Sequence, residues 1–423
     1  MLIEFSVENY LSFKERQKFC FMASSDKTFR DSHTFPLATK SRLRLLRSAI
    51  IYGANASGKS NLIKAITFLR DFVSHSAVDM QAIEKISLQP FKLDPKTLKM
   101  PSRFEIMFIY EGVRYHYGIA VTEERVFEEW LVAYPKKLPQ LWFERSYNNK
   151  NKTYTWNFGP SLKGERERIR RFVRQNSLFL SHAAQNNHLQ LSPVYKWFHK
   201  QVRPLRSTKE AGGYTASMCS NNSTFCKTVA QFIREADTGI ADIRVDKISV
   251  SKEVFDKLPQ NVKSELGENY EKSEILKITT IHKTAKPDFT VEFDLGMESD
   301  GTIRLFEFTG PWIDVLNSGA IILVDELDRS LHPHLTHQLV SLFHDTSVNK
   351  KNAQLICTSH DVSFLDQKTV RRDQIWFTDK DINGNSRLYS LRDFSPRKDE
   401  SLLKGYLYGR YGAVPFIRGK KLI

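Results

Sequence analysis

The sequence predicts an α/β fold built on a mixed sheet, with a β-rich part and a helical insertion. Residues 47–52 suit a buried strand, and helical spacing of apolar residues follows from Ser60 to Leu69. Residues 84–145 contain alternating segments, which are typical of antiparallel strands. Residues 296–423 alternate helix with strand, as the parallel half of an α/β domain does.

A glycine-rich loop joins the first of these strands to its helix. It consists of Gly53, Ala54, Asn55, Ala56, Ser57, Gly58, Lys59 and Ser60, and Asn61 follows it. The glycines allow a tight turn whose N–H groups point inward around a phosphate, and the helix N-terminus adds partial positive charge. The spacing predicts that Lys59 reaches the β- and γ-phosphates and that the Ser60 hydroxyl holds Mg²⁺. A glycine turn without a ligand is disfavoured because strand, helix, lysine and serine occur together.

The composition restricts the class of protein. The 423 residues leave room for two or three compact units, and 41% hydrophobic residues allow a sizeable core. No apolar run approaches the roughly 20 residues that span a bilayer, and the N-terminus alternates like a strand rather than a signal peptide. The four cysteines are scattered, which disfavours a zinc site or a disulfide framework. We therefore expect a cytoplasmic protein without a membrane partner.

The formal net charge of +15 has two explanations. A basic surface favours a nucleic-acid or other acidic partner, but solubility and neutralisation of a bound nucleotide would produce the same charge. Residues 163–174 concentrate five arginines among two glutamates: Arg166, Arg168, Arg170, Arg171 and Arg174, with Glu165 and Glu167. A solvated helix of mixed charge and a contact with a phosphate backbone both remain open there.

We expect three parts along the chain. Residues 1–160 would hold the phosphate loop and a β-rich lobe, including a hairpin formed by residues 104–110 and 113–119. Residues 161–240 would form a helical insertion, in which the glycine-, serine- and asparagine-rich segment 210–223 is expected to be a mobile loop. Residues 241–423 would complete the domain.

Two apolar strands in the last part end in polar residues. Residues 320–324 run into Asp325 and Glu326, and residues 354–357 run into Thr358, Ser359 and His360. Because ligands bind at the carboxyl ends of such strands, Asp325 is placed to support Mg²⁺ and Glu326 to orient or deprotonate an attacking water. His360 could donate a hydrogen bond to a γ-phosphate. Upstream, the turn from Ser299 to Thr302 opens a helix suited to an anion.

This order of motifs resembles the ABC-type ATPases, within them the SMC/RecF-like branch, and within that branch the AAA-like ATPases of bacterial anti-phage defence systems related to RloA and AbiLii. Supporting segments are residues 5–13, residues 90–93 and residues 409–416. The resemblance implies an ABC-type ATPase head with ATP and Mg²⁺ as cofactors. Asp300 and Thr302 depart from the LSGGQ signature of transporters, which weakens a transport function.

The resemblance also implies roles for single residues. Gln89 would sense Mg²⁺ and water, Ser299 and Gly301 would form a signature loop acting across a dimer, and Asp328 would belong to a loop at that interface. His360 would be the switch histidine. Two protomers would enclose two ATP molecules, in a homodimer or a higher oligomer.

The function implied by this resemblance is that of a sensor and scaffold in anti-phage defence, which controls a separately encoded toxic effector, a nuclease. The alternative is a RecF-like ATPase that binds DNA directly in DNA maintenance or repair. A nuclease within the chain is disfavoured because only about 60 residues follow His360. Asp379 and Asp381 are interpreted as part of a hairpin turn. A zinc site at His332, His334 and His337 is disfavoured by Pro333 and the loop context.

Overall fold

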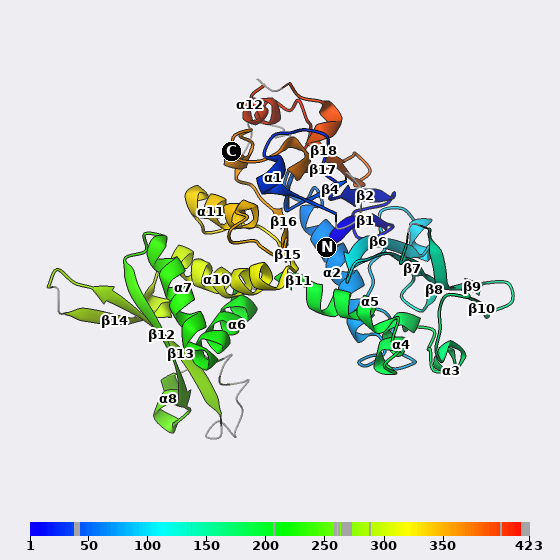
Figure 1. Cartoon of the computed structure of the whole chain (residues 1–423), viewed down its shortest axis with the longest axis horizontal. Helices are drawn as coiled ribbons and strands as arrows, with labels where there is room; N and C mark the ends of the chain where they lie inside the picture. Colours follow the sequence, from blue (N-terminus) through cyan, green and yellow to red (C-terminus); the bar gives the residue numbers. More distant parts are fainter. Residues whose placement is uncertain are drawn as a thin grey trace, which may run out of the picture. The chain divides into compact units, whose positions relative to one another are not determined.

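The computed structural model describes residues 1–37, 43–136, 138–205, 208–257, 260, 263, 273–286, 289–397 and 400–415. They divide into two compact units, whose elements are labelled in Figure 1. The first unit comprises Met1–Pro204, Val315–Asp328 and Thr336–Ile423, and the second comprises Leu205–Asp314 and Arg329–Leu335. The boundary after Pro204 lies within residues 161–240, which the sequence suggests as one insertion. Residues 161–204 belong to the first unit because their apolar side chains, such as Phe179 and Trp197, join its core.

A seven-stranded antiparallel sheet forms the β-rich part of the first unit, in the order β10-β9-β8-β7-β6-β1-β2. Its strands are β1 (Leu2–Glu8), β2 (Gln17–Cys20), β6 (Ser102–Tyr110), β7 (Val113–Val121), β8 (Val126–Tyr134), β9 (Gln140–Asn148) and β10 (Thr153–Phe158). The expected hairpin is present as β6 and β7, joined through Glu111 and Gly112. Both residues have positive φ (49° and 77°), as a tight hairpin turn requires.

A six-stranded sheet carries the phosphate loop, in the order β11-β15-β16-β5-β17-β18. Its strands are β5 (Ser48–Tyr52), β11 (Val202–Leu205), β15 (Ile321–Val324), β16 (Gln354–Thr358), β17 (Ile375–Lys380) and β18 (Ser386–Ser390). Strands β15, β16, β5 and β17 pair in parallel, and β18 pairs antiparallel to β17. β3 (Thr34–Pro36) and β4 (Arg44–Leu46) form a separate antiparallel pair. The mixed α/β class predicted from the sequence is therefore confirmed.

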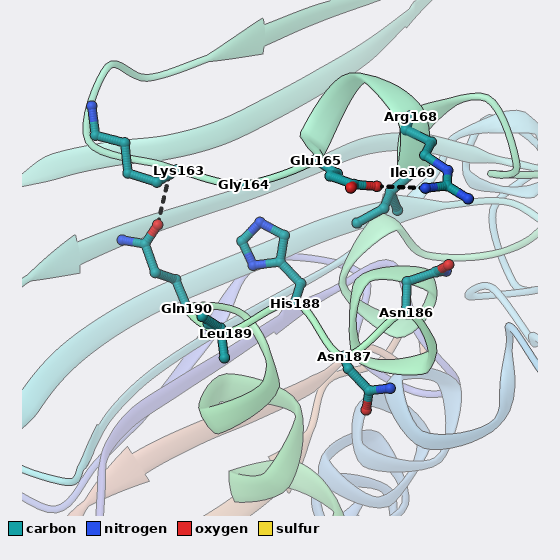
Figure 2. Close-up of a pocket in the computed structure, with 10 residues that line it drawn as sticks. All are labelled: Lys163, Gly164, Glu165, Arg168, Ile169, Asn186, Asn187, His188, Leu189 and Gln190. Atoms are coloured by element: carbon teal, nitrogen blue, oxygen red, sulfur yellow. Dashed lines mark hydrogen bonds and ion pairs between the residues drawn. The ribbon is translucent and has the colours of Figure 1, made fainter.

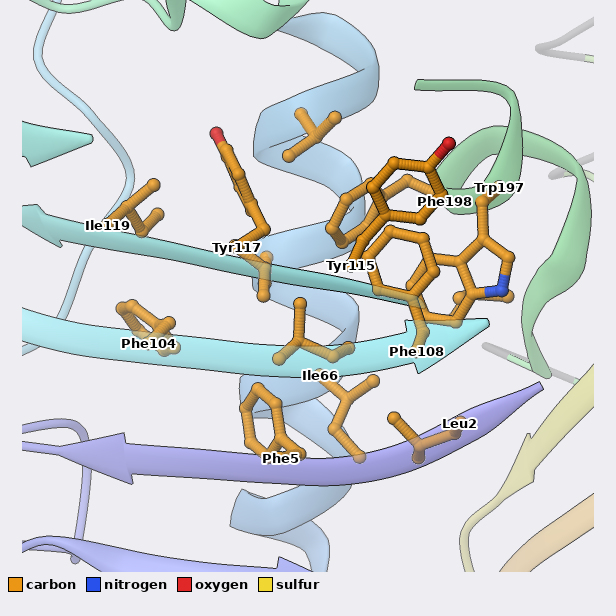
Figure 3. Packing of buried hydrophobic residues seen from close by; sticks show 14 of the residues in the cluster. Leu2, Phe5, Ile66, Phe104, Phe108, Tyr115, Tyr117, Ile119, Trp197 and Phe198 are labelled. Atoms are coloured by element: carbon orange, nitrogen blue, oxygen red, sulfur yellow. The ribbon is translucent and has the colours of Figure 1, made fainter. Parts of the chain in front are cut away.

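Helix α2 (Lys59–His75) joins the two sheets in one apolar core. It buries Leu62, Ile66 and Leu69, and the same buried cluster contains residues of β1, β6 and β7 as well as Ala49 and Ile51 of β5. Figure 3 shows α2 beside these strands, with the Phe108 ring against Trp197. These two rings stack at 3.7 Å between centroids. Burial of such side chains stabilises the fold by roughly 1.5–3 kcal/mol each.

The other helices of the first unit are short. They are α1 (Arg30–His33), α3 (Arg166–Arg170), α4 (Phe179–Gln185), α5 (Ser192–Lys196), α11 (Pro333–His344, whose first turn belongs to the second unit) and α12 (Leu402–Leu407), with 3-10 turns η1 (Thr97–Lys99), η5 (Val362–Phe364), η6 (Arg372–Gln374) and η7 (Leu391–Phe394), and a π-helical turn η2 (Trp197–Gln201). The arginine-rich segment is thus helical over one turn only.

The second unit combines a three-stranded sheet with the helices α6, α7 and α8 and with part of α10. Its elements are α6 (Thr208–Asn221), α7 (Ser223–Glu235), β12 (Ile240–Ser249), α8 (Lys252–Lys257), β13 (Glu274–Lys283), β14 (Thr290–Asp294), η4 (Leu295–Met297) and the first part of α10 (Asp300–Ser318). The expectation of a mobile loop at 210–223 is wrong, because α6 occupies it. Small residues of both helices permit close packing: a Cβ on Gly212 of α6 would lie 3.1 Å from Glu307 Cγ of α10, and one on Gly310 of α10 would lie 2.3 Å from Thr215 Oγ1 of α6. The composition therefore reflects helix contact rather than a loop.

Among the residues that the structure describes, no helix has the length and apolar character that crossing a membrane requires. Most of residues 258–272, and Phe416 of the C-terminal segment used for the family resemblance, lie outside the described residues.

Candidate nucleotide site

Lys59 lies at the first position of α2, folded back over its own loop. Its Nζ donates to the carbonyl oxygens of Gly53 (2.8 Å) and Ala54 (3.1 Å). The side chain is 7% exposed, while Asn55 and Ala56 at the tip of the loop are exposed. Ser60 is half-buried at the next helical position. The loop therefore holds a buried ammonium group at the N-terminus of a 17-residue helix, where partial positive charge is already present.

Two glycines of the loop are required by space as well as by conformation. Gly58 has φ +113°, and a Cβ there would lie 2.6 Å from Ser386 Oγ. A Cβ on Gly53 would lie 2.4 Å from the carbonyl oxygen of Thr378. The loop is thus pressed against β17 and β18, and side chains at either glycine would push it away from the sheet.

Hydroxyl groups fix the loop to the neighbouring strands. Ser57 Oγ lies 2.7 Å from Thr378 Oγ1, and Ser386 Oγ donates to the Ser57 carbonyl at 2.6 Å. Asn61 Nδ2 donates to Ser12 Oγ at 2.7 Å. Sequence analysis did not identify Thr378 or Ser386, since hydroxyl residues on remote strands give no local signal.

Thr358 at the end of β16 positions both acidic residues that follow β15. Its Oγ1 donates to Asp325 Oδ1 (2.6 Å) and accepts from the Glu326 backbone N–H (2.7 Å). Glu326 has φ +52°, an uncommon conformation for a non-glycine residue. Such backbone strain persists only where surrounding contacts hold it, and it occurs preferentially at functional sites. The structure therefore brings together Asp325 and Glu326, as the sequence predicts, and adds Thr358.

Asp328 and His360 meet at the same strand ends. The His360 backbone N–H donates to both carboxylate oxygens of Asp328 at 3.1 Å. The His360 side chain is exposed. Beside it, the Tyr52 hydroxyl donates to the Asp361 carbonyl at 2.8 Å, which ties the end of β5 to this loop.

The charges of these groups converge on Lys59. Burial lowers the pKa of Lys59, and Asp325, Glu326 and Asp328 act in the opposite direction by favouring its charged form. Residues 266 to 269 positions apart in the sequence thus share one electrostatic environment. Three carboxylates that act on one ammonium group leave an excess of negative charge here, and Mg²⁺ in a nucleotide site needs only one or two carboxylates besides water and phosphate.

Gln89 lies near the loop through its backbone. Its carbonyl oxygen accepts from the Leu11 N–H at 2.9 Å, and Leu11 precedes Ser12, the partner of Asn61. The side chain is exposed and lines a cavity of about 530 Å³ beside α2, together with Lys64 and Asp71. In the part of the chain that the structure describes, no hydrogen bond joins Gln89 to Asp325, whose Oδ1 accepts from Thr358.

Ser299 and Gly301 lie in the second unit. Ser299 Oγ accepts from the Thr302 N–H at 3.2 Å, so it caps α10. A Cβ on Gly301 would lie 2.9 Å from the carbonyl oxygen of Ser330. The predicted small-residue turn before a helix is therefore present.

The other sequence candidates have structural partners. His332 and His334 stack at 5.1 Å in the second unit, whereas His337 in the first unit contacts Ser363 Oγ at 2.7 Å. No group of three or more metal-ligating side chains occurs in the part of the chain that the structure describes. Asp381 accepts from the N–H groups of Asn383 and Asn385, as a turn residue between β17 and β18.

Local contacts hold four of the five arginines of this cluster, two of them through ion pairs. Arg168 pairs with Glu165 (2.9 Å) and Arg170 pairs with Glu167 (3.1 Å). Arg166 donates to the carbonyl oxygens of Gly159 and Leu162, and Arg174 donates to those of Ser76 and Ala77. The interpretation as a helix of mixed charge is therefore favoured over a phosphate contact.

Taken together, the loop, α2 and the acidic strand end define a P-loop nucleotide-binding fold. The chain belongs to the family described as "AAA domain, putative AbiEii toxin, Type IV TA system", whose model matches residues 48–366. The family connects this P-loop ATPase class with toxin–antitoxin systems. No curated protein matches the chain.

Solved structures with a similar course of the chain are heads of SMC proteins. An SMC head bound to the C-terminal winged-helix domain of ScpA has a TM-score of 0.42 and 13% identity, over 92% of this chain and 97% of that one. The SMC head domain from Thermotoga maritima has a TM-score of 0.39 and 11% identity, over 92% and 98%. A head with an extended coiled coil, bound to the C-terminal domain of ScpA from Pyrococcus furiosus, has a TM-score of 0.38 and 10% identity, over 97% and 98%.

Proposed function

We propose that the chain is a Mg²⁺-dependent ATP hydrolase. The observation that carries this proposal is that Lys59, held at the loop, lies within the electrostatic influence of Asp325 and Glu326, both positioned by Thr358. Lys59 and Ser60 would bind phosphate and Mg²⁺, with Asp325 supporting the metal and Gln89 sensing it. Glu326 would orient or deprotonate the attacking water, and His360 would contact the γ-phosphate.

The proposed cycle couples ATP to dimer formation. Ser299 and Gly301 of one protomer would face the nucleotide bound by the other, with Asp328 near the interface. ATP would then stabilise the closed dimer by binding it better than the open one, and hydrolysis would release it. Within a toxin–antitoxin or defence system, such a dimer would act as sensor and scaffold that controls a separately encoded effector, a nuclease.

The test compares four proteins: the parent, Lys59→Ala, Glu326→Gln and the control Glu15→Gln, which changes an exposed acid. We expect Lys59→Ala to lose ATP binding, because the buried ammonium group is removed. Glu326→Gln should bind ATP, hydrolyse it at least about 100-fold more slowly and accumulate as a dimer in light scattering. Glu15→Gln should match the parent. Parent-rate hydrolysis by Glu326→Gln would contradict the catalytic role of Glu326.

The effector needs a separate experiment. The tagged chain is purified from its native operon in ATP, and the eluate is analysed by light scattering. Co-elution of a second protein in an assembly larger than two ATPase chains would support the scaffold. A nucleotide-dependent dimer that elutes alone with DNA would instead favour a RecF-like ATPase.

A further inference from the structure

A groove at one end of the strands of the β-rich sheet has the composition of a nucleic-acid site. It has a volume of about 600 Å³ and lies between the segment 85–100, the turn joining β7 to β8 and the turn joining β9 to β10. Its lining includes five cationic side chains, from Lys85, Lys92, Lys99, Arg125 and Lys152, against two acidic ones, from Glu123 and Glu124. The groove is therefore positively charged.

Three of these lysines carry uncompensated charge. Lys92, Lys99 and Lys152 are exposed, and within the described residues none of them forms an ion pair or a side-chain hydrogen bond. Lys85 differs, because it lies 3.9 Å from Glu123. Unpaired lysines around a groove attract a polyanion, and they release counterions when they contact its phosphates.

Flat side chains line the same groove. Phe127 and Tyr147 are half-buried, with ring centroids 5.6 Å apart and planes at 89°. The Arg125 guanidinium lies over the Tyr147 ring at 4.3 Å. Aromatic rings and guanidinium planes are the surfaces on which unpaired bases stack, and Leu98 and Met100, each about half exposed, add apolar area.

A second pocket shows by contrast what makes this groove distinctive. It has a volume of about 440 Å³ and is lined by His188, Arg168 and Lys163 (Figure 2). There Arg168 is paired with Glu165 at 2.9 Å, and the backbone N–H of Lys163 donates to Gln190 Oε1 at 2.6 Å. His188 Nε2 is buried without a hydrogen-bond partner, but it is packed against Gly164, where a Cβ would lie 3.1 Å away. That pocket therefore offers a paired arginine and one exposed lysine, and its lining lacks the phenylalanine and tyrosine rings of the groove.

We propose that the groove between residues 85–100 and the two turns binds single-stranded nucleic acid. Lys92, Lys99 and Lys152 would contact the phosphates, while Phe127 and the Arg125–Tyr147 pair would stack with bases. An acidic protein segment would satisfy the lysines but would leave the flat side chains unused, so the observations favour the polynucleotide. This proposal does not depend on ATP hydrolysis, and it is tested without nucleotide and in EDTA.

The experiment measures fluorescence anisotropy of labelled 20-nucleotide oligo-dT and oligo-U with the full chain, from 50 to 200 mM salt. The groove variant is Lys92→Gln/Lys99→Gln/Lys152→Gln. Its matched control is Lys227→Gln/Lys252→Gln/Lys277→Gln, which removes the same charge from exposed lysines of the second unit. Three lost phosphate contacts should flatten the slope of log affinity against log salt by about 2, and the control should keep the parent slope.

The stacking component is tested with Phe127→Leu, which keeps apolar bulk. We expect its affinity for oligo-dT to fall about 5- to 150-fold, and Phe127→Tyr to retain parent affinity. Thermal melting of each variant verifies folding. Comparison of oligo-dT with oligo-U identifies DNA or RNA as the preferred strand.

Several outcomes would overturn the proposal. Absence of binding by the parent at 50 mM salt would do so directly. Equal loss in the groove variant and its control would show that only the overall charge matters. Equal affinity for duplex DNA would show a general attraction of polyanions without base stacking. Displacement of the oligonucleotide by polyglutamate at equal charge would indicate an acidic protein partner instead.

Discussion

Replacing Thr358 by valine tests whether one hydroxyl positions the acidic pair. Valine keeps the shape of the side chain, which is fully buried, but removes the hydrogen bonds to Asp325 Oδ1 and from the Glu326 N–H. A hydrogen bond to a charged group contributes roughly 1.5–3 kcal/mol. Asp325 and Glu326 are half-buried, so water recovers part of this loss, and we expect a destabilisation of about 2 kcal/mol.

The same interaction should matter for turnover. If the hydroxyl holds Asp325 and Glu326 in their reactive geometry, about 2 kcal/mol corresponds to about a 30-fold lower kcat for ATP hydrolysis. ATP affinity should change little, because the loop around Lys59 is intact. The assay combines steady-state ATPase rates with urea unfolding.

Two control variants separate geometry from stability. Thr358→Ser keeps the hydroxyl and should retain most of the activity. Thr309→Val removes a buried hydroxyl that donates to the Leu305 carbonyl at 2.7 Å, so it should lower stability without lowering kcat. Parent kcat and parent stability in Thr358→Val would refute the reasoning.

Two further predictions concern the fold itself. Glu129→Ala should destabilise the protein by roughly 3–5 kcal/mol in urea unfolding, because it leaves the buried Arg145, now paired at 3.0 Å, without its carboxylate; an unchanged midpoint would contradict this. Burial lowers the pKa of His33 to about 4 and that of His344 well below 6.5. The unfolded chain therefore binds more protons than the folded chain below pH 6.5. As the pH falls from 6.5 to 4, the free energy of unfolding should decrease by roughly 1.4 kcal/mol for each pH unit and for each of the two histidines. A free energy of unfolding that stays constant between pH 7 and 5 would contradict this prediction.

Local sequence patterns are sufficient to predict the contiguous elements of the nucleotide site. Strand β5, the glycine loop and α2 follow from contiguous residues, since alternation, glycine content and helical spacing are local properties. The hairpin of β6 and β7 was predictable for the same reason, because Glu111 and Gly112 form its turn. The expected acidic strand ends were also readable, as short apolar runs with polar termini.

Contacts between residues that are remote in the sequence become visible only in the folded chain. The contacts of Thr358 with Asp325 and Glu326 join neighbouring strands 32 residues or more apart, and no local pattern encodes that pairing. The same reason explains the error at 210–223, where small residues serve the packing of α6 on α10 rather than a loop. Which charged side chains are paired also depends on contacts that form only in the folded chain. The sequence draws attention to the arginines of residues 166–174, but folding pairs two of them with Glu165 and Glu167, and it gathers the exposed Lys92, Lys99 and Lys152 around one groove.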